Sequence, residues 1–331
     1  MEKIDFVVTW VDSNDKKWLE DKNLYDKKNL DIKKLNDVSK YRDWDFFKYW
    51  FRAVEKYAPW VNKIHLVTYG HVPEWLNENS EKLNVVTHNQ ILPLTALPTF
   101  NSQAIELALN KIKGLSENFV YFNDDMFLND YVTPEDFFVD GLPKDYGLFN
   151  AITPHLNGIE HTIVNNIELI NERFDKKEVI KKNLNKFFNI KYGLWNIRNV
   201  LLLPWQQITG FYEPHTAVAL KKSTFNLVVE KEYKAIQKTI HNKFRTKDDV
   251  NFWIVRYWQI CLGQFIPQKK EFSKMYYISS DNNLLFKDIQ ESNSKIICLN
   301  DSDSVFNYEK TKKEIKSIFL NKFAEKSMFE K

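Results

Sequence analysis

The sequence predicts an α/β fold, a largely parallel Rossmann-like sheet flanked by helices, with a helical insertion in the second half of the chain. Three observations lead to this prediction. Strand-like and helix-like patterns alternate over the first ~125 residues, which is typical of a parallel sheet with helices on its faces. The runs 4–11 and 119–122 are almost unbroken β-branched and aromatic residues, as strands covered on both faces require. Both runs are followed by acid, at Asp12 and at Asp124-Asp125, where ligands of open α/β sheets collect.

Periodicity and turn residues define the elements of the first half. A polar stretch rich in Lys, Asp and Asn over 13–40 is interpreted as a mobile loop, with room for one helix, that could close over a substrate. Apolar residues at three- and four-residue spacing predict an amphipathic helix that Pro59 ends. Ser102 opens a second helix with one apolar face. Predicted strands cover 4–11, 64–69, 85–88 and 119–122, and predicted helices cover 44–57 and 102–112.

Beyond Pro134 the pattern changes to helices and long connections. A last strand ends at Asn300-Asp301 and repeats the motif of a strand followed by polar oxygen-bearing side chains. We interpret 1–331 as a single domain with an α/β half (1–140), a mainly helical half (141–290), and a returning strand with a C-terminal helix (291–331). In this second part, predicted helices cover 163–174, 177–188, 221–240, 248–262 and 308–323, and the predicted strand covers 295–299.

Composition limits the classes of function. The chain has 331 residues, of which 44% are hydrophobic, so it can bury a large core. Its 47 basic and 44 acidic side chains are interspersed, and the net charge of +3 does not indicate a nucleic-acid-binding protein. The Lys-rich stretch 176–191 is interpreted as solvated helix faces, with an anionic substrate or a membrane surface as the alternative.

The cysteines and the hydropathy of the chain indicate the cellular compartment of the protein. Cys261 and Cys298 form no metal-binding spacing and are expected to be buried thiols of a reducing cytosol. No window reaches the ~18 apolar residues of a membrane span, and no leader sequence is recognised. We therefore expect a cytoplasmic protein, with any membrane contact peripheral and at the inner face.

Several common active-site motifs are absent from the sequence. With eight glycines, the chain contains neither G-x-G-x-x-G nor G-x-x-x-x-G-K-[ST], which argues against a nicotinamide or P-loop enzyme. G-x-S-x-G is also missing, which weakens a serine-hydrolase interpretation. The remaining candidates for chemistry are acids, one or two histidines and an arginine.

The adjacent acids Asp124 and Asp125 are the first candidates. On an extended backbone their side chains diverge, so one ligates a metal more easily than both, unless a turn brings them together. Hard oxygen ligands of this kind suit Mg²⁺, or Mn²⁺, shared with substrate phosphates. The alternative is that Asn123 and the two acids only form a turn and a helix cap.

His215 and Arg245 are the other candidates. His215 lies in a turn-forming Glu-Pro-His context before an apolar run, where a structural role is the more common one. Arg245 could clamp a phosphate through two parallel hydrogen bonds, or could simply pair with Asp249. Neither residue is decisive alone.

Taken together, these residues resemble the Stealth family of hexose-1-phosphate transferases, which includes bacterial capsule phosphotransferases and the GlcNAc-1-phosphotransferase of lysosomal-enzyme tagging. The resemblance spans nearly the whole chain in four ordered blocks. The stretch 149–204 matches a family pattern least clearly. The blocks are IDFVVTWVDSND at 4–15; 52–128, including LPTFNSQAIE and FNDDMFL; EPHTAVALKKSTF at 213–225 with KFRTKDDVNFW at 243–253; and CLNDSDS at 298–304 with the tail EKSMFEK.

The resemblance implies a UDP-hexose donor, UDP-GlcNAc or a relative, and an oligosaccharide or capsular polysaccharide acceptor. The product would be a phosphodiester, and UMP would leave. His215 is the first candidate for the general base, with an aspartate as the runner-up, and Arg245 would neutralise the transferring phosphoryl group. The expected catalytic residues are His215, Arg245 and Asp125; the expected substrate-binding residues are Trp10, Asp12, Asn123, Asp249 and Asp301; and the expected metal ligands are Asp124 and Asn300.

Two rival functions remain open at this point. A metal-dependent glycosyltransferase that uses a nucleotide sugar would share the sheet and the acidic motif, but it would release UDP. A noncatalytic carbohydrate-binding or capsule-assembly protein would use the abundant aromatic residues, which make up 15% of the chain.

Overall fold

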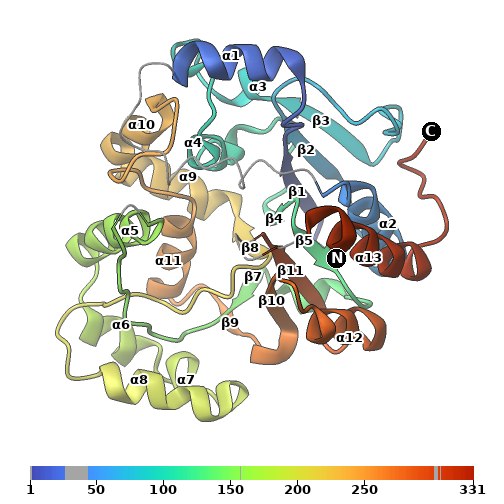
Figure 1. Cartoon of the computed structure of the whole chain (residues 1–331). Coiled ribbons are helices and arrows are strands. Elements are labelled where there is room, and N and C mark those ends of the chain that lie inside the picture. Colours follow the sequence, from blue (N-terminus) through green and yellow to red (C-terminus); the bar gives the residue numbers. More distant parts are fainter. Residues whose placement is uncertain (1, 27–43, 157, 302–304, 306) are drawn as a thin grey trace.

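The computed structural model describes residues 2–26, 44–156, 158–301, 305 and 307–331. A five-stranded sheet in the order β3-β2-β1-β4-β8 lies at its centre (Figure 1). The first four of these strands run parallel and β8 runs antiparallel to β4, which confirms the predicted largely parallel sheet. The strands are β1 (Ile4–Trp10), β2 (Ile64–Thr68), β3 (Leu83–Thr87), β4 (Asn118–Asn123) and β8 (Val218–Lys221).

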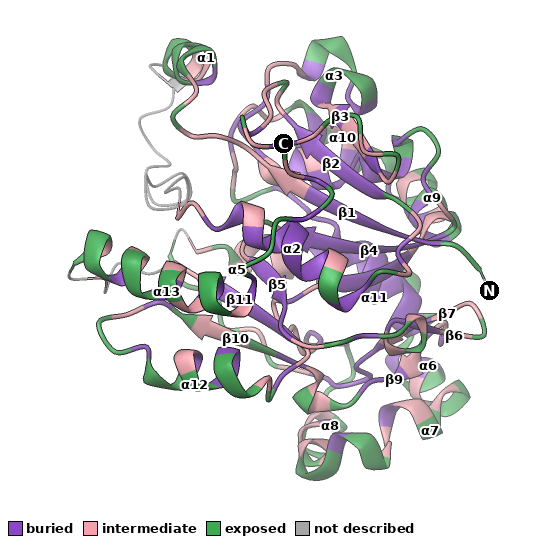
Figure 2. Cartoon of the chain, turned by 90° about the vertical axis from the view of Figure 1, so that its right-hand side faces the viewer, coloured by how far each residue is buried: buried purple, intermediate pink, exposed green. Residues whose placement is uncertain are grey.

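The two central strands are buried on both faces, as their apolar sequences require. Phe6 and Phe122 belong to the core on one face, whereas Val7 and Tyr121 belong to the core on the other. This alternation follows from the two-residue period of a strand. Figure 2 shows β1 and β4 buried between helices whose outer sides are exposed.

A second, three-stranded sheet joins the end of the chain to the centre. Its strands are β5 (Met126–Leu128), β10 (Ser273–Tyr277) and β11 (Ile296–Asn300), in the order β10-β11-β5. The predicted last strand is β11, and it runs antiparallel to β5. A small third sheet contains β6 (Phe138–Val139), β7 (Leu142–Asp145) and β9 (Ile266–Pro267).

Helices cover both faces of the central sheet, and most occur where periodicity predicts them. No helix in the described part of the chain is long and apolar enough to cross a membrane. The α-helices are α1 (Lys16–Asp26), α2 (Phe47–Tyr57), α3 (His88–Ile91), α4 (Ser102–Glu106), α5 (Glu160–Arg173), α6 (Lys176–Lys182), α7 (Leu184–Phe187), α8 (Asn196–Leu202), α9 (Lys222–Lys231), α10 (Tyr233–His241), α11 (Trp253–Cys261), α12 (Asn283–Glu291) and α13 (Tyr308–Lys322). The 3₁₀ helices are η2 (Leu94–Ala96), η3 (Leu109–Lys111), η4 (Pro134–Asp136), η5 (Ile190–Trp195) and η6 (Lys270–Phe272).

Several predicted bounds are corrected. The helix expected over 102–112 ends at Glu106 and continues as η3, and the helix expected over 221–240 is divided into α9 and α10. The helix expected over 248–262 begins only at Trp253, because side chains take the backbone donors before it. The Thr239 hydroxyl, for example, accepts from the backbone N–H of Val250 at 3.0 Å.

Two broader expectations are also modified. The half 141–290 is mainly helical, but it supplies β8 to the central sheet, so the two halves of the chain share one sheet. The polar stretch over 13–40 does contain one helix, α1. The rest of that expected closing loop, 27–40, lies outside the described residues.

Candidate active site

The acidic turn Asp124-Asp125 connects β4 to β5 at the edge where the parallel strands end. The two neighbours differ in exposure: Asp124 is exposed and Asp125 is half-buried. The backbone N–H of Leu299 donates to the Asp125 carbonyl at 2.9 Å, so β11 ends beside this turn. Asn300 follows Leu299 as the last residue of β11. The expected approach of the last strand to the acids is therefore present.

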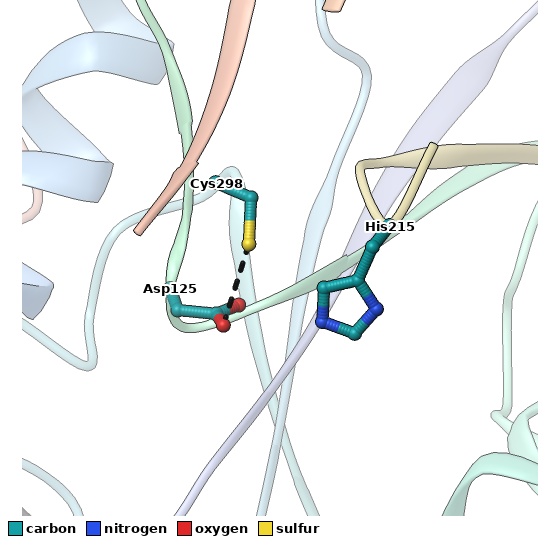
Figure 3. A group of neighbouring side chains, drawn as sticks. All are labelled: Asp125, His215 and Cys298. Atoms are coloured by element: carbon teal, nitrogen blue, oxygen red, sulfur yellow. Dashed lines mark hydrogen bonds between the residues drawn. The ribbon is translucent and has the colours of Figure 1, made fainter. Parts of the chain in front are cut away.

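His215 reaches the same turn from β8. Val218 pairs with Tyr121 on β4, and the loop that precedes β8 then carries His215 toward the end of β4. Its backbone has φ of 49°, in the left-handed region that non-glycine residues seldom occupy. Such strain often marks a functional position. Figure 3 shows the imidazole directed toward Asp125.

Asp125, His215 and Cys298 form a compact group in which one potential ligand atom of each lies within 4.8 Å of the others. Burial raises the pKa of Asp125, while the nearby charge of His215 and a hydrogen bond from the Cys298 thiol act in the opposite direction. That thiol lies 3.5 Å from Oδ2 of Asp125. Burial, reinforced by the Asp125 charge, raises the pKa of Cys298 well above its usual range, so the thiol remains protonated and donates.

The donor atoms at this edge fit a hard divalent cation. Carboxylates of Asp124 and Asp125, with the amide oxygen of Asn300 on the adjoining strand, are the ligand types that Mg²⁺ and Mn²⁺ prefer. Cys298 would complete a site for a softer metal only after losing its proton. Protonated, it fits the role of a hydrogen-bond donor to Asp125.

The end of β1 supplies a second polar group. The backbone N–H of Asp12 donates to Nε2 of His71 at 2.7 Å, and the Asp12 carboxylate accepts from the backbone of Asn14 at 2.8 Å. Burial lowers the pKa of His71, although Asp15 and Asp12 act in the opposite direction. A neutral imidazole can accept at Nε2, so His71 fixes the chain where β1 ends.

Trp10, also at the end of β1, is half-buried. Its ring stacks on Phe47 at 5.5 Å between centroids and meets His71 edge-on at 5.4 Å. Trp10 is therefore packed between two rings and keeps part of its surface accessible at the sheet edge.

Arg245 lies beside the N-terminal turn of α4. Its Nη2 donates to the Ser102 hydroxyl at 2.6 Å. Glu106, one turn further along α4, is buried, and burial raises its pKa to about 7 against the opposing effects of Arg245, Ser102 and Tyr121. The Tyr121 hydroxyl in turn lies 3.0 Å from that of Thr9 on β1. Arg245 is thus linked through a buried acid to the two central strands.

Asp249 is expected either to bind substrate or only to orient Arg245. Its side chain is fully buried, and both carboxylate oxygens accept hydrogen bonds. Thr246 donates through its backbone N–H at 2.8 Å and its hydroxyl at 2.9 Å, and the amides of Asn242 and Asn101 donate at 2.6 Å and 2.9 Å. This geometry favours a positioning role for the loop that carries Arg245.

Two further residues that are expected to bind substrate also lie at the ends of strands. Asn123 is the last residue of β4, and Asp301 follows β11 directly. Sequence reasoning missed His71, Cys298 and Glu106. A usable signal for Glu106 was its spacing from Ser102, because residues four apart share one face of a helix.

Models of known protein families match two parts of the chain. Family models described as "Stealth protein CR2, conserved region 2" and "Stealth protein CR1, conserved region 1" match residues 40–145 and 2–30. The first two sequence blocks are thereby confirmed. Among solved structures, the galactosyltransferase LgtC in complex with donor and acceptor sugar analogues is 12% identical, with a TM-score of 0.38 and 95% of each chain covered.

Relatives of full length are named as phosphotransferases. A "Capsular polysaccharide phosphotransferase WcwK" of Streptococcus pneumoniae is 48% identical over 331 residues, covering 100% of this chain and 99% of that protein. An "Exopolysaccharide phosphotransferase cps2G" of Lactiplantibacillus plantarum is 44% identical over 330 residues, covering 99% of this chain and 96% of that protein. With identity of this degree from end to end, the chain belongs to the Stealth protein family.

Proposed function

We propose that this protein is a capsular polysaccharide phosphotransferase that transfers hexose-1-phosphate from a UDP-sugar to a hydroxyl group of a glycan acceptor. GlcNAc-1-phosphate is the first candidate for the transferred group. The observation that carries the proposal is the 48% identity, over the whole chain, to a relative named for capsular polysaccharide phosphotransfer. The grouping of His215 with Asp125 at the edge of the sheet supplies side chains suited to that chemistry.

The reaction in this proposal is a single displacement at phosphorus. His215 accepts the proton of the acceptor hydroxyl, and the acceptor oxygen forms a bond to the sugar-side phosphorus of the donor. The bond from that phosphorus to the UMP oxygen breaks, so UMP leaves and a phosphodiester remains. The bond between the anomeric carbon and its oxygen is untouched, so the sugar keeps its configuration.

Charge neutralisation and positioning provide most of the catalysis in such a transfer. Arg245 neutralises the transferring phosphoryl group. Asp125 orients His215 and balances the positive charge that His215 gains with the proton. Asp12, Asn123 and Asp301 surround the donor, and the exposed part of Trp10 contacts it. Their places at the ends of β1, β4 and β11 support this assignment.

Asp124 and Asn300 are the proposed ligands of Mg²⁺ or Mn²⁺. When bound, the ion supplies positive charge for the donor diphosphate. The exposed carboxylate of Asp124 and the end of β11 beside it support this assignment.

We further propose that all of 1–331 acts as one catalytic domain, because β8 from its middle part completes the central sheet. Two free, buried cysteines are consistent with a cytoplasmic location, where a UDP-sugar donor would be at hand. We propose that the protein works beside the capsule machinery at the inner face of the membrane.

The product nucleotide tests this function. The purified protein is incubated with Mg²⁺, UDP-GlcNAc and a panel of short capsule-type oligosaccharides, and UMP is separated from UDP by chromatography. The proposal predicts UMP whose formation depends on acceptor. UDP formed in proportion to acceptor would instead identify a glycosyltransferase.

Variants separate catalysis from binding. His215→Ala and Arg245→Ala should each lower the rate by about 10²-fold or more without unfolding the protein. His155→Ala is the matched control, because the His155 side chain is 78% exposed outside the site. Full turnover in folded Arg245→Ala or Asp124→Ala protein would contradict the roles proposed for these residues, whereas no turnover in the wild type would favour a noncatalytic carbohydrate-binding role.

A further inference from the structure

A surface of exposed apolar side chains lies on the segment formed by α7, η5 and α8. Figures 1 and 2 show this segment at the periphery of the molecule, away from the central sheet. Ile190 is 93% exposed and Leu194 is 83% exposed. We call this surface the apolar tip; its residues are Leu184, Ile190, Leu194, Ile197, Val200, Leu201, Leu203 and Trp205.

Helix α8 has apolar side chains on its exposed face and a polar side chain on its buried face. Ile197, Val200 and Leu201 have the spacing of a single helix face, and all three are exposed. The opposite side carries Asn199, which is fully buried. Its amide accepts from the backbone N–H of Phe149 at 2.7 Å and donates to the carbonyl of Gly147 at 2.8 Å. A surface helix normally turns its polar face to water, so the apolar face of α8 lacks its usual cover.

Buried polar contacts hold this segment in place. Lys176 is buried, contrary to the solvated face expected over 176–191, and its ammonium group donates to the carbonyl of Trp205 at 2.8 Å. Asn196 donates to the carbonyl of Asn189 at 2.8 Å. These hydrogen bonds hold the backbone of the segment in place, and its aliphatic side chains therefore remain exposed to solvent.

The charge around the apolar tip indicates what covers it. Between residues 177 and 207 the chain has six basic side chains and one acidic side chain, Glu178. Lys181 and Lys182 on α6 are 79% and 73% exposed. A symmetric contact with a second copy would set these like charges against each other. An anionic surface with an apolar interior complements both the charge and the aliphatic side chains. Trp205 adds an aromatic side chain of the type enriched where membranes meet water.

We propose that the apolar tip docks on an anionic lipid bilayer. Its aliphatic side chains enter the boundary between headgroups and acyl chains, and the lysines of α6 face the lipid phosphates. This inference concerns a surface apart from the candidate active site and does not depend on the transfer reaction.

Vesicle binding tests the inference. The protein is sedimented with vesicles of phosphatidylcholine alone and with vesicles that also contain phosphatidylglycerol. We expect strong partition to the anionic vesicles and a decrease as salt is added. The double variant Leu194→Asn, Leu201→Asn should reduce this partition by about tenfold or more, because two aliphatic anchors are lost. Both side chains are exposed, so folding should be unaffected.

The matched control is Leu94→Asn with Leu284→Asn, which alters two leucines that are 81% and 72% exposed on other elements. It should bind vesicles like the wild type. Absence of binding to anionic vesicles, or equal loss in both double variants, would overturn the proposal. So would light scattering that shows a wild-type dimer converted to a monomer by Leu194→Asn, Leu201→Asn, since the tip would then be a self-association surface.

Discussion

At the scale of single residues, burial sets the charge of two groups beside the candidate site. Glu106 has a pKa raised to about 7 by its apolar surroundings, even though Arg245 is close. Cys298 has a pKa well above its usual range, so it acts as a donor to Asp125. Shifts of this kind are typical of functional sites.

The first prediction concerns Glu106 and pH. Because its folded pKa is raised from 4.5 to about 7, the contribution of Glu106 to stability should be fully present below pH 4.5 and should be lost as pH rises through 7. Above pH 7 the loss should be about 3 kcal/mol, at roughly 1.4 kcal/mol per pKa unit. Glu106→Gln should therefore be more stable than the wild type at pH 8, by urea unfolding, with little difference near pH 4.5. The exposed Glu78→Gln is the control; identical pH dependence in wild type and Glu106→Gln would contradict the assignment.

The second prediction concerns Cys298 and the metal. Cys298→Ser keeps a hydrogen-bond donor beside Asp125, so the rate should change by less than about tenfold. A chelator should abolish activity, and Mg²⁺ or Mn²⁺ should restore it equally in wild type and variant. Restoration by Zn²⁺ in the wild type only would instead make the sulfur a metal ligand.

At the scale of elements, the loop between α10 and α11 places Arg245. Asp249 gathers four donors from this loop and from the residue that precedes α4. The backbone of Phe100 also donates to the carbonyl of Lys243 at 2.8 Å. The loop and the start of α4 are therefore held as one unit, and Arg245 and Ser102 meet across it.

The third prediction follows from this unit. Asp249→Ala leaves buried donors without a partner, so the free energy of unfolding should fall by about 3 kcal/mol. Activity should fall as well, because Arg245 loses its position. Asp248→Ala, at a side chain that is 55% exposed, should do neither. Equal stability of the two variants in urea would show that Asp249 is not the support of this loop.

The strands that end in acid could be predicted from sequence. The predicted strands 4–11 and 119–122 differ from β1 and β4 by at most one residue at either end, because a strand covered on both faces needs an unbroken run of β-branched and aromatic residues. Short strands such as β5 were missed, since three residues carry little periodicity. Helix bounds failed where side chains such as Thr239 replaced the helical hydrogen bonds.

The candidate site was predicted only in part, because its residues are brought together by contacts between distant parts of the sequence. The register between β4 and β8, on which the position of His215 depends, joins residues about 100 apart and leaves no local pattern. The burial of Asp249 likewise depends on Asn101, far away in sequence. Residue types indicated the chemistry, whereas only the fold shows which groups meet.

At the scale of the whole molecule, the C-terminal tail closes on the first half of the chain. Arg52 on α2 donates to both carboxylate oxygens of Glu330, at 2.7 Å and 2.6 Å, and to the carbonyl of Phe323 at 2.8 Å. Burial alone would raise the pKa of Glu330, but hydrogen bonds from Arg52 and Ser327 outweigh it and the pKa is lowered. This pair joins the second and last sequence blocks.

The fourth prediction concerns this closure. Arg52→Ala leaves a buried carboxylate unpaired, so the free energy of unfolding should fall by about 3 kcal/mol or more. The contribution of Glu330 should be present above its ordinary pKa of 4.5 and should be lost as pH falls through its lowered value. The exposed pair Lys287–Glu291 is the control, and Lys287→Ala should cost less than about 1 kcal/mol. Comparable losses for the two variants would contradict a structural role for the tail.

The fate of the sugar-side phosphorus tests the central claim most directly. The donor is UDP-GlcNAc with a radioactive label on that phosphorus alone, incubated with acceptor oligosaccharide and Mg²⁺, and the glycan is separated from the nucleotides. Transfer of hexose-1-phosphate predicts label in the glycan, in step with the release of unlabelled UMP, and none after His215→Ala. Label that stays in UDP while the glycan gains an unlabelled sugar would contradict the proposed reaction.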